Sequence, residues 1–134
     1  MNEAPINLNI HPIHLGLGAT ATVEPEFSGE MGWYEGYATR HATDGVEGRL
    51  VSMHTFDQPW DVWEMHPFGS EVVLCVDGRI ALHQENLDGT KVAITLVAGE
   101  CAVNEPGVWH TADVEEAAIV LFITPGAGTE HRPH

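Results

Sequence analysis

Basic side chains are scarce in this sequence. Among its 134 residues only 5 are Lys or Arg, against 20 Asp or Glu, which gives a formal net charge of −15. A nucleic-acid surface needs clustered Lys and Arg, and so does docking to an anionic membrane. The composition therefore argues against both kinds of partner. It leaves an anionic small molecule open, because one buried arginine or one metal ion can override the overall field.

Long apolar runs and an export signal are also missing. No apolar stretch approaches the roughly 18 residues that a membrane-spanning helix needs. The first residues, Met1-Asn2-Glu3-Ala4-Pro5, lack the basic start and apolar run of a signal peptide. Only two cysteines occur, Cys75 and Cys101, both in strand-like apolar segments. We expect a cytoplasmic protein with two buried thiols, and a disulfide or a thiolate ligand is the alternative.

Helical periodicity is absent over any long stretch, and 14 Gly and 8 Pro divide the chain into short segments. Asp-Gly pairs at 44–45, 77–78 and 88–89 are typical of hairpin turns. Strands are predicted over 50–56, 71–76, 79–84, 91–97, 101–104 and 117–124. Strands this short and regular predict one all-β domain, a sandwich or barrel.

The predicted organisation has three parts. Residues 1–48 form an N-terminal extension or outer strands, residues 49–124 form the barrel core, and residues 125–134 form a polar tail for which disorder is the default. Two predicted strands, 72–76 and 118–123, are apolar on both faces, although a strand of a small antiparallel barrel normally has one wet face. We therefore expect the N-terminal segment or, preferably, a second subunit to cover them, so that the protein is a homodimer.

Potential metal ligands are concentrated at one place in the predicted barrel. Glu64-x-His66-x4-Glu71-x6-Gly78 is followed by Pro106-Gly107-x-x-His110. Glu64 and His66 share one face of a strand, Glu71 begins the next strand, and His110 begins another. Two carboxylates and two imidazoles held together would favour a divalent cation, since a buried carboxylate is costly unless it is paired or metal-bound. Hydrogen-bonded core residues, or pairing with Arg49 or Arg79, are the alternatives.

These motifs resemble the two signatures of the cupin superfamily, whose fold is a double-stranded β-helix, a jelly-roll-like barrel. The first signature is Gly-x5-His-x-His-x3–4-Glu-x6-Gly, and here Glu64 stands at the place of its first His. The second, Gly-x5-Pro-x-Gly-x2-His, is matched by Gly99, Pro106-Gly107 and His110, with one extra residue before a contiguous Pro-Gly pair. The resemblance covers roughly residues 50–124, and the whole chain is similar to small single-domain bacterial cupins. These share its Gly-Thr-Glu-His-Arg-Pro tail, which implies docking of the tail across the barrel mouth as the alternative to disorder.

The resemblance implies a divalent metal ion, Fe, Mn, Ni or Zn, held by Glu64, His66, Glu71 and His110. It leaves three roles for Glu64: a fourth ligand, a general base beside an incomplete site, or part of a barrel that binds no metal. Trp60 and His54 are the candidates for a substrate pocket. Catalytic residues are not assigned.

This interpretation leaves three functions open, of which the third is a mainly structural dimer with a residual site. The first is a metal-dependent enzyme of the dioxygenase, isomerase or lyase type that acts on a small organic molecule. The alternative is a non-catalytic barrel that binds a small-molecule ligand. A general acid or base in the pocket would separate the first two, and Tyr34, Tyr37 and His54 are the candidates that the sequence offers.

Overall fold

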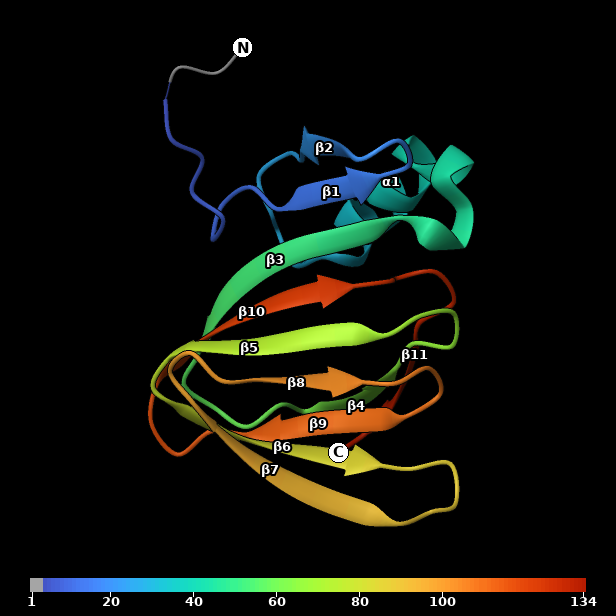
Figure 1. Ribbon diagram of the computed structural model, residues 1–134. Coiled ribbons are helices and arrows are strands. Elements are labelled where there is room, and N and C mark those ends of the chain that lie inside the picture. Colours follow the sequence, from blue (N-terminus) through green and yellow to red (C-terminus); the bar gives the residue numbers. More distant parts are fainter. Residues whose placement is uncertain (1–3) are drawn as a thin grey trace.

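The computed structural model describes residues 4–134 and shows two antiparallel sheets that face each other (Figure 1). Residues 1–3, which belong to the segment examined for an export signal, lie outside the described residues. The prediction of an all-β cupin-like barrel is confirmed, because most of the ordered structure is strand and the two sheets close around one interior. Within residues 4–134 no helix has the length and apolarity to cross a membrane.

The first sheet has six strands in the order β2-β1-β3-β10-β5-β8. Their bounds are β1 Ile13–Gly16, β2 Thr20–Val23, β3 Arg49–Phe56, β5 Glu71–Asp77, β8 Cys101–Asn104 and β10 Ala118–Thr124. The second sheet has five strands in the order β11-β4-β9-β6-β7. Their bounds are β4 Val62–Met65, β6 Arg79–Glu85, β7 Lys91–Val97, β9 Trp109–Asp113 and β11 Glu130–Pro133.

The hydrophobic core lies between the two sheets and follows from alternation along the strands. In β5, Val73 and Cys75 are fully buried, whereas Val72 and Leu74 on the opposite face are half-buried. Val120 of β10 enters the same core from the neighbouring strand. When one face of a strand packs inward, every second residue along the strand is buried.

Gly78 makes the tight turn between β5 and β6 and explains the glycine that ends the first motif. Its φ is +82°, a left-handed conformation that glycine adopts without the steric cost of a side chain. A Cβ at this position would lie 2.6 Å from the carbonyl oxygen of Ala117, so a side chain is excluded by contact as well as by conformation. Because β5 and β6 belong to different sheets, this turn carries the chain from the first sheet to the second.

The N-terminal segment differs from the prediction in one respect. It does provide outer strands, because β1 pairs with β3 and β2 pairs with β1. It also contains a helix that the sequence did not reveal, α1 (Met31–Arg40), followed by a 3-10 helix over Ala42–Glu47. The helix was missed because it is short, has two glycines and buries none of its residues fully. Aromatic contacts hold it, including a stack of Trp33 on Tyr37.

Two further expectations are wrong. The tail is ordered rather than disordered over Glu130–Pro133, since β11 pairs with β4 along its whole length. On the outer face of this strand the guanidinium of Arg132 lies between the rings of Trp63 and Trp109, 5.1 and 4.5 Å from their centroids. Cys75 is buried as expected, but Cys101 is exposed, because it starts β8 at the edge of the first sheet. Both cysteines are free thiols.

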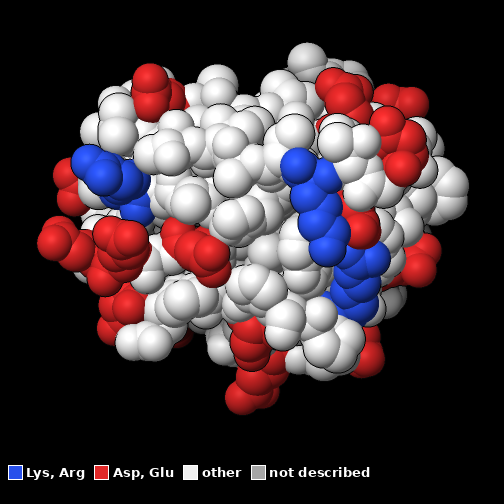
Figure 2. Space-filling view, turned by 90° about the horizontal axis from the view of Figure 1, so that it is seen from below, with Lys and Arg blue, Asp and Glu red and all other residues white. Residues whose placement is uncertain are grey.

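Basic side chains are as scarce on the surface as in the sequence. On the face shown in Figure 2 the few Lys and Arg side chains stand among acidic ones and form no continuous basic patch. Several of the basic groups are neutralised locally, as in the ion pairs of Arg132 and Lys91 with Glu85 and of Arg40 with Glu24.

Candidate metal centre

Four side chains meet inside the barrel where the two sheets approach each other. Glu64 of β4 lies opposite His110 of β9 in the strand register, so both project from the second sheet. His66 follows directly after β4, and Glu71 begins β5 in the first sheet. His66, Glu71 and His110 are buried, with at most 3% of their surface exposed, and Glu64 is half-buried. The structure thus brings together all four residues that the motifs predicted.

The ligand atoms of Glu64, His66 and His110 all lie within 4.8 Å of one another. Glu64 Oε2 is 3.8 Å from His66 Nε2 and 4.0 Å from His110 Nε2. A transition metal lies about 2.0–2.2 Å from nitrogen and oxygen ligands, so one ion bridges atoms up to about 4.2 Å apart. The spacing fits a single divalent ion.

The hydrogen bonds around the site fix which nitrogen of each imidazole carries the proton. Thr129 Oγ1 donates its only proton to the carbonyl oxygen of Gly126 at 2.9 Å. It must therefore accept from His66 Nδ1, which lies 2.8 Å away, so the proton of His66 is on Nδ1. His110 Nδ1 faces the carbonyl oxygen of Val108 at 3.5 Å, a group that can only accept. In the neutral rings both Nε2 atoms are left with a free lone pair.

Those two Nε2 atoms point into the centre without hydrogen-bond partners. Among residues 4–134 they and Trp60 Nε1 are the buried side-chain nitrogens or oxygens that lack one. Lone pairs on buried nitrogens with the second ring nitrogen tied to the protein are typical of metal-binding histidines. The arrangement is therefore what a metal site requires of its imidazoles.

Glu71 faces the same two Nε2 atoms as a fixed negative charge. Its Oε1 is 3.0 Å from His110 Nε2, and its Oε2 is 3.3 Å from His66 Nε2. Asn104 Nδ2 donates to Oε1 at 3.1 Å, and Thr124 Oγ1 donates to Oε2 at 2.6 Å. Two donors on the carboxylate favour its ionised form. With bare Nε2 atoms beside ionised oxygens, only a cation or a bound proton relieves the repulsion.

The pKa values express the same coupling. Burial alone would raise the pKa of Glu71, but His110 and His66 outweigh it and hold the pKa of this carboxyl well below its usual range. Burial alone would lower the pKa of His110, but Glu71 and, less strongly, Glu64 raise it above its ordinary value. Without a metal ion, a proton on His110 is thus the favoured cation in this site.

One neighbour of the centre was not predicted. His131 of β11 lies opposite Glu64 in the strand register, and its Nε2 is 3.4 Å from Glu64 Oε1. The signal was present in the alternation of the tail, but a polar tail without a hydrophobic run gave no reason to expect a strand. Arg49 and Arg79, the alternative partners for the carboxylates, form no ion pair within residues 4–134.

The centre opens into a large cavity of about 1410 Å³. Glu64, His66 and Glu71 line one part of it. Trp60 and His54, the two residues expected at a substrate pocket, also line it. The ring of Trp60 lies edge-on to His110 at 6.2 Å, whereas His54 packs among Phe27, Phe56 and Phe122. His54 is therefore part of the aromatic wall, and burial lowers its pKa.

Comparison with solved structures decides the fold family. A cupin-2 domain protein from Shewanella frigidimarina matches with a TM-score of 0.50 and 25% identity, over 57% of this chain and 70% of its own. A protein with a double-stranded β-helix domain from Klebsiella pneumoniae matches with a TM-score of 0.52 and 24% identity, over 64% and 76%. The chain has the cupin fold. No protein-family model matches it, and no relative was found among curated proteins.

A third cupin neighbour is an enzyme. A hydroquinone 1,2-dioxygenase in complex with Cd²⁺ and 4-hydroxybenzonitrile matches with a TM-score of 0.52 and 14% identity, over 57% of this chain and 56% of its own. Against several other structural neighbours the chain spans less than two thirds of their length. At these identities the likeness shows a shared cupin fold, and the activity of this chain has to be argued from its own site.

Proposed function

We propose that this cupin binds one divalent transition-metal ion through Glu64, His66 and His110, with Glu71 as a fourth ligand or as a charge beside their Nε2 atoms. The observation that carries the proposal is the pair of buried, unpartnered Nε2 atoms whose tautomers are set by Thr129 and Val108. Two imidazoles and one carboxylate with open positions suit Fe(II), and the same set accepts Mn, Ni or Zn.

The proposed activity is a metal-dependent reaction of a small organic molecule, of the dioxygenase, isomerase or lyase type. The metal ion would supply Lewis acidity toward a bound oxygen atom. The protein supplies a cavity whose aromatic wall, including Trp60 and His54, excludes water and favours an apolar or aromatic body. Glu64 is half-buried at the cavity surface, so it is the ligand that an incoming molecule meets first.

The test is metal analysis of the full chain, purified without a chelator or a His tag and reconstituted separately with Fe(II), Mn(II), Ni(II) and Zn(II). We expect close to one equivalent of bound metal after removal of the excess. Less than a tenth of an equivalent of every metal, after reconstitution, would end the metalloenzyme proposal.

The alternative is a non-catalytic cupin that binds a small molecule. The size of the cavity favours it, since about 1410 Å³ exceeds the roughly 300–1,000 Å³ typical of small-molecule sites and leaves room beyond a metal-bound group. A proton-transfer group in the cavity, separate from the metal ligands, would favour the enzyme over the binder.

We also propose that the chain forms a homodimer through the outer face of the six-stranded sheet. Leu121 of β10 lies between Met53 of β3 and Leu74 of β5 in the strand registers, and all three are half-buried rather than buried. Val72 and Val103 continue the apolar surface toward β8. A second copy is the occupant that covers it most simply. Light scattering at micromolar concentration should give the mass of a dimer for the wild type and the mass of a monomer for Leu121→Asp. A wild-type protein with the mass of a monomer would contradict the proposal.

A further inference from the structure

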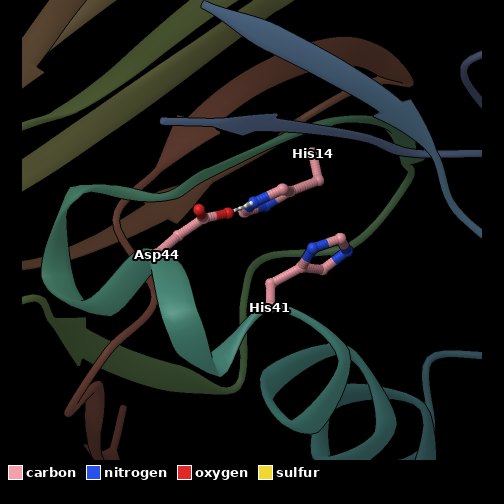
Figure 3. Close-up of side chains that lie close together, drawn as sticks. All are labelled: His14, His41 and Asp44. Atoms are coloured by element: carbon pink, nitrogen blue, oxygen red, sulfur yellow. Dashed lines mark hydrogen bonds and ion pairs between the residues drawn. The ribbon is translucent and has the colours of Figure 1, made fainter. Parts of the chain in front are cut away.

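A second polar cluster lies in the N-terminal segment, away from the proposed metal ligands. Figure 3 shows His14 of β1 with Asp44 from the 3-10 helix and His41 from the end of α1. His14 is 2% exposed, and its Nε2 lies 2.5 Å from Asp44 Oδ2. Its other ring nitrogen, Nδ1, lies 2.6 Å from the hydroxyl of Tyr37. Both nitrogens of a buried imidazole are therefore engaged by side chains from two other elements.

The direction of each hydrogen bond in the cluster is determined. The hydrogen bond from His14 lowers the pKa of Asp44, so this carboxylate is ionised and can only accept. His14 in its neutral form carries its proton on Nε2, and Nδ1 accepts the hydroxyl proton of Tyr37. The result is an ordered chain from Tyr37 through His14 to Asp44. A hydroxyl, an imidazole and a carboxylate in this order form the arrangement by which proteins withdraw a proton from a hydroxyl group.

Metal binding explains the cluster less well than proton transfer does. The ligand atoms of His14, His41 and Asp44 lie within 4.8 Å of one another. However, the rings of His14 and His41 are stacked, with centroids 3.6 Å apart and planes at 18° (Figure 3). In-plane lone pairs of nearly parallel rings do not converge on one ion, and His14 has no free nitrogen.

The strand registers place this cluster in one line with the metal centre. His14 pairs with Leu50 of β3, Leu50 pairs with Thr124 of β10, and Thr124 Oγ1 donates to Glu71 at the start of β5. Residues paired in this way project from the same face of a sheet. Three strand spacings of roughly 4.8 Å put the backbones of His14 and Glu71 about 14 Å apart. All four residues line the same cavity, as does Tyr37.

We infer that Tyr37 and His14 form a proton-accepting site at the far end of the cavity, with Asp44 as the positioning residue. We also infer that the ligand of this cupin has two polar ends. One end binds at the metal centre, so the inference rests on the proposed function. The other end carries an acidic O–H or N–H. The bond between that hydrogen and the ligand breaks as the proton moves to Tyr37 Oη, while the hydroxyl proton of Tyr37 moves to His14 Nδ1. The ligand becomes an anion, and Asp44 stabilises the imidazolium.

The surroundings of Tyr37 agree with a group that passes a proton on rather than loses one. Burial, followed by the charges of Glu24 and Asp44, raises the pKa of Tyr37 well above its usual value, against the effect of Arg40. Arg40 Nη2 donates to one oxygen of Glu24, and His41 Nε2 lies 2.9 Å from the other. A free tyrosinate is therefore disfavoured, and concerted transfer to His14 avoids it.

The body of the ligand is expected to be apolar or aromatic. Phe27, Phe56 and Phe122 line the cavity together with His54, whose ring lies 4.8–6.2 Å from theirs. An aryl group with a short acid side chain has the chemistry and the length for both ends. This substrate class distinguishes the inference from the general proposal of a metal-dependent cupin.

The test compares trans-4-hydroxycinnamate with trans-cinnamate as probes of the zinc-loaded full chain. Both carry a carboxylate for the metal, and only the first carries a far-end hydroxyl, whose ionisation shifts its absorption to longer wavelength. We expect the hydroxyl to tighten binding roughly fivefold or more, and the bound phenol to ionise at lower pH than the free one. Tyr37→Phe should abolish both effects. Asp44→Asn should abolish the ionisation shift, because an amide cannot stabilise the imidazolium.

Thr39→Val is the control, because it removes a hydroxyl from the same helix that only donates to the Glu35 carbonyl, outside the cavity and the chain of hydrogen bonds; both effects should persist. Zinc-dependent cinnamate binding without any advantage for the hydroxyl overturns the inference and leaves the metal proposal intact. An advantage that survives in Tyr37→Phe overturns it as well, and so does a zinc-loaded protein that binds neither probe. A protein that does not retain zinc would instead contradict the proposed function.

Discussion

Thr129 offers a test of the metal centre that leaves every proposed ligand in place. Its hydroxyl accepts from His66 Nδ1 at 2.8 Å while it donates to the carbonyl of Gly126. This contact holds the ring in the tautomer and orientation that present Nε2 to the centre. Thr129→Val keeps the shape of the side chain and removes the acceptor. His66 then has no partner that fixes its tautomer, and its ring is free to turn.

Thr129→Val should lower metal affinity by an intermediate amount, less than the loss of a ligand does. Removal of an outer partner of a metal-binding histidine typically costs 10–100-fold in metal affinity. This corresponds to about 1.4–2.8 kcal/mol at 1.4 kcal/mol per factor of ten. The loss of a ligand itself, as in His66→Ala, should be much larger. Metal affinity should therefore decrease from the wild type to Thr129→Val and again from Thr129→Val to His66→Ala.

Competition with a chromophoric zinc chelator measures these affinities over the required range. Thr129→Ser restores the hydroxyl and should recover most of the wild-type affinity. Thr39→Val is the control, because Thr39 Oγ1 only donates to the Glu35 carbonyl on the exposed surface of α1. An affinity of Thr129→Val within twofold of wild type would refute the role given to this hydroxyl, and so would a loss as complete as that of His66→Ala.

Three further predictions concern the centre and the strand beside it. His110→Ala should abolish metal retention, whereas His83→Ala, which removes a half-exposed imidazole paired with Asp113, should leave one equivalent bound in the same metal analysis. Zinc affinity should fall as the pH falls, because the metal must displace the proton of His110. Since Glu71 raises the pKa of His110, the fall should begin above the ordinary pKa of histidine. A zinc affinity that is the same from pH 8 to pH 5.5 would contradict the assignment. Arg132→Ala should lower the free energy of unfolding in urea by about 1–2 kcal/mol, since the cation leaves two indole faces and the carboxylate of Glu85. An unchanged midpoint would show that these contacts together contribute nothing.

The convergence of the proposed metal ligands was predictable from the sequence because most of its geometry is local. Glu64 and His66 are two residues apart near a single strand, and Glu71 follows after one turn, so the spacing alone brings them to one point. His110 could be added because a Pro-Gly turn places it at the start of a strand. Strand alternation also indicated that Val73 and Cys75 point into the core, and both are fully buried.

The residues that escaped prediction depend on contacts between distant segments. His14 lies in a four-residue strand without a hydrophobic pattern, and its partner Tyr37 lies on a helix with no buried residue. His131 reaches Glu64 because a polar tail adds a strand to β4. In each case the partner is 23 or more residues away, and no periodicity within the segment records the pairing. Cys101 was misjudged for a related reason, since an apolar strand at a sheet edge has no neighbour to bury it.

The line of paired residues His14, Leu50, Thr124 and Glu71 has a consequence for how this barrel can diversify. One end of the cavity is lined from strands β4 and β5, and the other from β1, α1 and the 3-10 helix, which precede the barrel core in the chain. Leu50 and Thr124 separate the two ends as a spacer of fixed width. Substitutions before residue 49 can therefore alter the length and chemistry of the accepted molecule while the proposed ligands stay unchanged. Reactivity and selectivity are encoded in separate stretches of the chain.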